Sequence, residues 1–278
     1  MKKEVRTVCF DEDLSIEALR FEGVTQPFPN HFHDYYVIGS VQGGRREMFC
    51  KSGAVKISGG DVLLLEPGDS HGCVQTDDGV FDYAALNVSA DVMRGLAEEI
   101  TGENGTPGFS ENVLKNAELS ALIVRLCGLI LSGSNGFEKE ETLLILMSNI
   151  LENYGEPFLQ AVAPNDVYVE RVCEYINARF DKRVTLGELC EVGRMSRSTL
   201  LRSFAKFKGI TPYRYLQSVR INRARELLTN GTPPIKAASL TGFSDQSHFS
   251  NAFHTFFGLS PAAYGKIFGR SEKENKKR

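Results

Sequence analysis

The sequence has no tryptophan, no long apolar run and no closely spaced cysteine pair. Its longest apolar stretch, ALIVRLCGLIL, is interrupted by Arg125 and is far shorter than the roughly 20 residues of a membrane span. No apolar run follows the first lysines, so no secretory signal is expected. The six cysteines favour reduced thiols over a zinc finger or a disulfide framework. These absences predict a cytoplasmic protein without membrane contact.

Charge is divided unevenly along the 278 residues. Residues 1–165 carry 12 Lys and Arg against 25 Asp and Glu, a net charge of −13, whereas residues 166–278 carry 20 against 10, a net charge of +10. A chain of this length, with 42% hydrophobic residues, can form two domains with separate cores. The division predicts a basic domain that binds a polyanion, joined to an acidic domain. A basic face that is only solvated is the alternative.

The first part of the chain changes its hydrophobic period near residue 90. Residues 28–88 contain short apolar runs separated by turn signals, which predicts a small β-barrel or sandwich. Residues 118–131 and 138–154 are predicted to be helices, and the first is apolar on almost every side. Such a helix must be covered by its own domain or by a second copy of the chain. The segment GEPFLQAVAPND predicts a domain boundary near residues 155–165.

The second part contains strong helix start signals. The segment TLGE, beginning at Thr185, is a capping box, Ser196 is an N-cap candidate, and Thr211 and Ser260 each precede a proline. A long helix is predicted over 212–229, because Asn230-Gly231 is a typical helix end. In GFSDQSHFSNAF, residues 242–253, the N-cap candidates for a further helix are Ser244 and Asp245.

Residues 196–215 recur as residues 245–264, at an offset of 49. The residues that recur unchanged are Ser198, Phe204, Phe207, Gly209, Pro212 and Tyr215, which match Ser247, Phe253, Phe256, Gly258, Pro261 and Tyr264. Each copy has a short helix, a tight turn and a longer helix, which is the helix-turn-helix pattern. The second helix of this motif enters the DNA major groove with its first two turns toward the base edges.

Polar residues at the start of the two longer helices are therefore the candidates for reading DNA. They are Arg197, Ser198, Thr199 and Arg202 in the first copy, and Gln246, Ser247, His248 and Asn251 in the second. Arginine suits guanine, and asparagine or glutamine suits adenine. An ordinary helical bundle explains either copy alone, but it does not explain the repeat, the caps and the basic charge together.

The strings LGELCEVGRMSRSTLLRSFAKFKGITPYRYLQSVRINRARELL and GFSDQSHFSNAFHTFFGLSPAAY closely resemble the DNA-binding domain of the AraC/XylS family of bacterial transcription regulators. The resemblance implies a domain over residues 166–270, with helix-turn-helix units at about 185–208 and 235–257 set into two adjacent major-groove turns. It implies base contacts by Ser198, Leu201, Arg202, Gln246, Ser247 and Asn251.

Three features depart from the family pattern. In Gly193-Arg194 the glycine stands one residue earlier than usual and an arginine takes its place, which predicts a strained or re-aimed turn. Asn251 stands where the family often has arginine. Pro234 and Ala237 stand where larger aliphatic residues are common, which predicts looser packing of the second unit.

Residues 28–75 resemble the cupin-like ligand-binding domain that many members of this family carry, through His31-Phe32-His33 and GDVLLLEPGDSH, which ends at His71. The resemblance implies a ligand-binding and dimerisation domain over 1–160, with the barrel at about 10–88 and helices at about 90–154. A homodimer is expected through helices 118–154.

Several polar residues of this barrel are candidates for binding an effector. His31, His33 and Tyr35 point to one face of a strand, and barrel closure brings His71 toward them. With Arg45 or Arg46 they are the ligand-binding candidates, and strand residues that face solvent are the alternative. Metal-binding cupins have a carboxylate about four residues after the second histidine, where this chain has Val37 and Ile38. No metal and no cofactor are therefore expected.

Together these features predict an α+β multidomain protein that is a ligand-responsive transcription regulator and not an enzyme. The adjacent residues Ser70 and His71 lie in a predicted turn and form no catalytic triad. The alternatives are a metal-dependent cupin enzyme fused to a DNA-binding domain, and a ligand-independent DNA-binding protein. The expected partners are double-stranded DNA, a small-molecule effector, a second subunit and, for an activator, RNA polymerase.

Overall fold

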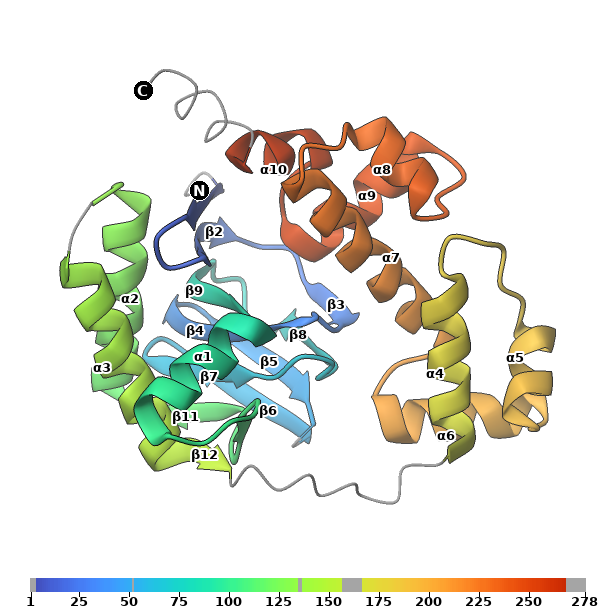
Figure 1. Cartoon of the computed structure of the whole chain (residues 1–278), viewed down its shortest axis with the longest axis horizontal. Coiled ribbons are helices and arrows are strands. Elements are labelled where there is room, and N and C mark those ends of the chain that lie inside the picture. The colour runs from blue at the N-terminus through green and yellow to red at the C-terminus, as the bar shows by residue number, and fades with distance from the viewer. Residues whose placement is uncertain (1–3, 52, 135–136, 157–166, 269–278) are drawn as a thin grey trace. The chain divides into compact units, whose positions relative to one another are not determined.

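The computed structural model describes residues 4–51, 53–134, 137–156 and 167–268. The chain divides into two compact units, Met1–Phe28 with His33–Gln160 and Pro29–Phe32 with Ala161–Arg278. The first unit is rich in strands and the second is helical (Figure 1), so the predicted α+β multidomain fold is confirmed. The boundary predicted near residues 155–165 falls mainly within 157–166, outside the described residues. None of the described helices has the length and apolarity that crossing a membrane requires.

The described strands form three sheets. They are β1 (Val5–Asp11), β2 (Ile16–Val24), β3 (Phe28–His31), β4 (Tyr35–Gly43), β5 (Arg45–Cys50), β6 (Gly53–Ser58), β7 (Asp61–Leu65), β8 (His71–Gln75), β9 (Phe81–Ser89), β10 (Gly108–Phe109), β11 (Val113–Lys115) and β12 (Gly155–Glu156). One sheet has the order β1-β2-β9-β4-β7-β11, another has the order β3-β8-β5-β6, and β10 pairs with β12. The strands begin at Val5, earlier than the barrel predicted at about 10–88.

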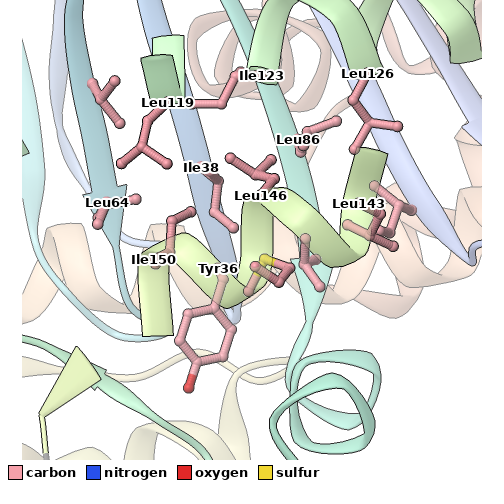
Figure 2. Close-up of a cluster of buried hydrophobic side chains, with 14 of the residues drawn as sticks. Tyr36, Ile38, Leu64, Leu86, Leu119, Ile123, Leu126, Leu143, Leu146 and Ile150 are labelled. Carbon is pink, nitrogen blue, oxygen red and sulfur yellow. The ribbon is translucent and has the colours of Figure 1, made fainter. Parts of the chain in front are cut away.

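Three helices cover one face of the six-stranded sheet. They are α1 (Ala90–Thr101), α2 (Ala117–Leu131) and α3 (Phe137–Tyr154), close to the predicted ranges. Ile38 and Leu86 point from the strands toward Leu119 of α2 and Leu146 of α3 (Figure 2). The inner side of α2 is thus covered by its own domain. Because strand side chains alternate, the neighbours of Ile38 point to the opposite face, between the two sheets.

Seven helices form the described part of the second unit. They are α4 (Val167–Arg179), α5 (Leu186–Gly193), α6 (Arg197–Lys208), α7 (Pro212–Thr229), α8 (Pro234–Leu240), α9 (Gln246–Phe257) and α10 (Pro261–Phe268). The long helix predicted over 212–229 is confirmed as α7, which packs against α4 and α6 as well as α8, α9 and α10. Leu200 and Phe204 are fully buried on one side of this unit, and Phe249 and Phe253 on the other.

The helix starts follow the local sequence signals. Thr185 and Glu188 form the predicted capping box, and backbone and hydroxyl donation from Thr185 lowers the pKa of the Glu188 carboxyl. The Ser196 hydroxyl accepts from the Thr199 amide at 3.3 Å. Asp245 rather than Ser244 caps α9, since its Oδ1 accepts from the His248 amide at 2.6 Å. A carboxylate at this end also suits the helix dipole.

The turn between α5 and α6 contains the strain that the sequence predicts. Arg194 has φ +49°, the left-handed region that favours glycine. The glycine stands one residue earlier because of packing, since a Cβ on Gly193 would lie only 3.0 Å from the Val172 Cγ2. Gly193 is therefore needed for close contact between α5 and α4, and Arg194 takes the strained conformation.

Arg194→Gly is expected to stabilise the second unit by about 1 kcal/mol, because glycine adopts the left-handed region without the steric cost of a Cβ. For a unit of about 100 residues this raises the melting temperature by about 4–8 °C. Calorimetry of the full chain measures the change. Lys206→Gly, at an exposed position within α6, is the control and lowers stability by about 1 kcal/mol. An unchanged or lower melting temperature for Arg194→Gly would show that the turn is not strained.

Candidate DNA interface and effector site

The helices α6 and α9 are built alike, as the sequence repeat predicts. Each has 12 residues, begins at a polar N-cap and ends at a left-handed glycine, Gly209 with φ +66° and Gly258 with φ +70°. Leu200 and Phe204 are buried on the inner side of α6, and Phe249 and Phe253 lie at the matching positions of α9. The apolar residues of the repeat thus fix both helices to the core and leave their other sides exposed.

The exposed sides carry the residues that the sequence predicts to contact bases. The exposed candidates are Arg197, Thr199, Leu201 and Arg202 on α6, and Gln246, Ser247, His248 and Asn251 on α9. The side chain of Ser198 lies outside the described part of the structure. The His248 ring meets the Phe243 ring edge-on at 5.4 Å, so this imidazole also supports the turn before α9. The predicted set therefore lies in the first turns of both helices, where a groove-reading helix presents its side chains.

Further basic residues on this unit were not predicted from the sequence as DNA contacts. Arg194, Lys206, Arg214 and Lys236 are exposed, and the +10 charge of the C-terminal part was the signal for them. Other arginines of α7 have structural contacts. The Arg220 Nε donates to the Phe180 carbonyl at 2.7 Å, and the Arg225 Nε donates to the Tyr264 hydroxyl at 2.8 Å.

The predicted single strand through His31, His33 and Tyr35 is not formed, because β3 ends at His31, His33 lies in the connection and Tyr35 begins β4. The His33 ring stacks on Tyr35 at 4.6 Å and lies 5.1 Å from the His71 ring. His31 belongs to the segment Pro29–Phe32, which is part of the helical unit. The expectation that the protein holds no metal stays a prediction.

The contacts of these rings indicate their protonation. The Nδ1 atoms of His31 and His71 lie 2.7 and 2.9 Å from the carbonyls of Pro29 and Asp69. A carbonyl only accepts, so each Nδ1 carries a hydrogen and, in the neutral ring, Nε2 is an acceptor. Burial lowers the pKa of His71 to about 4, which keeps the ring neutral at physiological pH. These rings are thus suited to accept hydrogen bonds from a polar ligand.

The two arginine candidates of β5 have opposite environments. Arg45 is exposed, whereas Arg46 is 1% exposed. The Arg46 Nη2 donates to the Val24 carbonyl at 2.8 Å, and its guanidinium lies 5.2 Å from the centre of the Phe81 ring. Since Val24 and Phe81 belong to the other sheet, Arg46 points between the sheets. Of the two alternatives, only Arg46 has the position of an interior ligand-binding residue.

Other enclosed polar groups were missed in the sequence. The Asn87 Nδ2 donates to the Glu17 Oε1 at 2.6 Å, and both residues are buried. The Tyr83 ring occupies the space that a side chain on Gly39 would fill, and burial raises its pKa. The period-2 alternation of β2 and β9 was the available signal, but only the paired register places these residues on one face.

A basic helical unit with two exposed polar recognition helices, together with a β unit that encloses polar groups, defines a DNA-binding protein with a ligand-binding domain. Residues 189–267 match the family model of a helix-turn-helix domain, and residues 13–147 match that of an AraC-like ligand binding domain. The chain belongs to the AraC family of transcription regulators.

Similar proteins agree with this family. The HTH-type transcriptional regulator YbfI of Bacillus subtilis (strain 168) is 44% identical over 275 residues, 99% of each chain. The HTH-type transcriptional activator RhaS of Salmonella typhimurium is 25% identical over 243 residues, 84% of this chain and 86% of RhaS. These relatives are transcription regulators, which places the chain in a regulator family rather than an enzyme family.

Solved structures show the same fold. Apo ToxT from Vibrio cholerae matches with a TM-score of 0.56 and 15% identity, over 91% of this chain and 98% of that one. ToxT bound to an unsaturated fatty acid matches with a TM-score of 0.53 and 18% identity, over 96% and 98%. The predicted two-domain regulator, with a DNA-binding domain and a small-molecule-binding domain, is confirmed.

Proposed function

We propose that α6 and α9 read base edges in two adjacent major-groove turns of one DNA duplex. The observation that carries this proposal is the similarity of the two helices. In both, the inner face is buried and the first turns expose polar side chains. The connecting helix α7 has 18 residues, a length of about 27 Å. This length is most of the roughly 34 Å between successive groove turns.

The chemistry of each exposed side chain suits a particular contact. The Arg202 guanidinium matches the O6 and N7 of guanine, and the Gln246 amide matches the N6 and N7 of adenine. Leu201 is 40% exposed and suits the thymine methyl group. Polar contacts are assigned to Arg197, Ser198, Ser247, His248 and Asn251. Contacts to phosphates are assigned to Arg194, Lys206, Arg214 and Lys236, which position the domain without reading sequence.

The test is selection of binding sites from a random duplex pool by the full chain. We expect two sequence elements whose centres lie about 10 base pairs apart, since each recognition helix occupies one groove turn. A single short element, or enrichment without sequence preference, would contradict the two-groove arrangement.

An effector in the β unit is proposed to bind to His33, Tyr35, His71 and Arg46. The neutral His71 imidazole supplies an acceptor, and Arg46 supplies donors from β5, the strand that pairs with β8. Such an effector changes DNA binding only if its affinity differs between two states of the protein. Like RhaS, which is named an activator, the chain is proposed to activate transcription through contact with RNA polymerase.

The outer side of α3 supports a homodimer through helices 118–154. Phe137 is 75% exposed and Ile145 is 45% exposed, although the opposite side of the helix is in the core. A second copy that covers this face removes both side chains from water. Ile145→Glu is expected to convert the dimer to a monomer in sedimentation velocity. Ile235→Glu, at an isoleucine of α8 that is 67% exposed, is the control. A dimer that survives Ile145→Glu would contradict this interface.

A further inference from the structure

Arg46 is a fully enclosed cation in the interior of the β unit. It is 1% exposed and is one of the largest fully buried side chains among the described residues. Its guanidinium crosses from β5 to the other sheet, where Nη2 donates to the Val24 carbonyl at 2.8 Å. The ring of Phe81 lies 5.2 Å from the guanidinium carbon. A side chain in this position loses its hydration and must be compensated by the groups around it.

The surrounding residues do not supply that compensation. A guanidinium has five N–H donors, and the Arg46 Nε and Nη1 have no hydrogen-bond partner among the described residues. Across the strand pairs, Arg46 faces Ile57 and Gln75, neither of which is acidic. The carboxylate whose charge acts on Arg46 is that of Asp77, which is exposed in the β8–β9 connection. Arginine keeps its charge in proteins, so the interior holds a positive charge with one neutral acceptor.

A second enclosed guanidinium, that of Arg6, lies near the aromatic rings of Phe21, Tyr83 and Phe81. The side chain of Arg6 is 4% exposed, and its guanidinium lies 4.9 Å from the Phe21 ring. Phe21 pairs with Tyr83 across β2 and β9, and the Tyr83 ring stacks on Phe81 at 5.9 Å. Arg6 Nε contacts Glu4 at 2.6 Å, but Nη1 and Nη2 have no hydrogen-bond partner in the described part of the chain.

We propose that Arg46 binds an anionic group, a carboxylate or a phosphate monoester, on an effector whose apolar or aromatic body lies against Phe21 and Phe81. The proposal rests on the proposed binding of an effector in the β unit and names its chemical class. An arginine fork matches the paired oxygens of either anion, and charge-assisted hydrogen bonds are about twice as strong as neutral ones. Arg6 adds positive potential on the same side.

The first experiment needs no ligand. Arg46→Met replaces the guanidinium with an apolar side chain that fits the interior, so the melting temperature is expected to equal or exceed that of the wild type. Arg45→Met, at the exposed neighbour on the same strand, is the control. A melting temperature more than about 4 °C below that of the control would mean that Arg46 is a structural residue, and would overturn the proposal.

The second experiment measures thermal melts of the full chain with three anions and their neutral analogues, each at about 10 mM. The probes are benzoate with benzamide, octanoate with octanamide, and phenyl phosphate with benzyl alcohol, and inorganic phosphate tests a free ion. We expect at least one organic anion to raise the melting temperature of the wild type and of Arg45→Met by about 2–4 °C. Arg46→Met, the neutral analogues and inorganic phosphate are expected to give no shift.

The outcomes separate this inference from the proposed function. A shift that persists in Arg46→Met, an equal shift from a neutral analogue or from inorganic phosphate, or no shift from any anion overturns the anionic class. Binding of the Arg46→Met variant to the selected DNA site tests the DNA-binding function separately. That binding is expected to equal wild-type binding without effector, because Arg46 lies in the β unit.

Discussion

Residues 166–278 alone are expected to bind duplex DNA with an affinity that falls about 10³–10⁵-fold between 50 and 200 mM salt. This part of the chain carries 20 Lys and Arg against 10 Asp and Glu. Each phosphate that a basic side chain neutralises releases counterions and adds about 0.9 to the slope of log affinity against log salt. Fluorescence anisotropy with a labelled duplex, repeated over a salt series, measures that slope.

Controls distinguish phosphate contacts from nonspecific charge effects. Circular dichroism first verifies that the isolated part is folded, as expected from its own core around Phe204 and Phe253. In the full chain, Lys236→Gln should lower the slope by about 0.9, because its ammonium is assigned to a phosphate. Lys56→Gln removes an exposed lysine from β6 of the other unit and should leave the slope unchanged. A folded domain whose binding is insensitive to salt would contradict the assignment of the basic surface to DNA.

The sequence predicts the helical unit more closely than the β unit, because helix boundaries depend on local signals. The range of α7 is predicted to the residue, since Thr211-Pro212 and Asn230-Gly231 start and end the helix through contacts within one turn. The buried faces of α6 and α9 follow from the 3.6-residue period and the repeat. Asp245 was one of two cap candidates, and only the backbone geometry distinguishes it from Ser244.

Which side chains of the β unit face its interior depends on strand pairings between segments that are distant in the sequence. Arg45 and Arg46 are adjacent, and β5 pairs with both β6 and β8 in a register that turns Arg46 inward. Glu17 and Asn87 meet although 70 residues separate them in the sequence. A shift of one residue in either pairing would send each side chain to the opposite face. The histidines were found because they lie in short motifs. Glu17, Tyr83 and Asn87 lie in no motif, and the alternation of their strands alone does not show that they meet.

Packing also explains the departure from the family pattern at the first turn. The sequence shows that the glycine is displaced to Gly193, but it does not show why. In the structure a Cβ at this position would approach Val172 and would also lie 3.8 Å from the Leu200 Cδ1. The tight contact at this position is the one between α5 and Val172 of α4. Such a contact cannot be predicted from the turn sequence alone.

Arg202→Ala and Gln246→Ala are each expected to weaken binding to the selected site by about 1–3 kcal/mol and to relax base preference in different halves of it. Arg202 lies in the second turn of α6, where a long guanidinium side chain reaches the base edges of one groove turn. Gln246 is the first residue of α9 and is exposed beside the Asp245 cap. Because α7 separates the two helices, the affected bases should lie about 10 base pairs apart.

The measurement is a titration of both variants against duplexes that carry every single-base change in the site. Lys206→Ala is the control for a phosphate contact and should weaken binding to every duplex by a similar factor. The wild type should distinguish between bases at the positions where Arg202→Ala or Gln246→Ala does not. The double variant should lose both base preferences, and its loss of binding free energy should equal the sum of the two single losses because the two sites are independent. Uniform weakening by Arg202→Ala or Gln246→Ala would mean that the residue contacts phosphate. Relaxation of the same base positions by both variants would contradict the placement of α6 and α9 in separate groove turns.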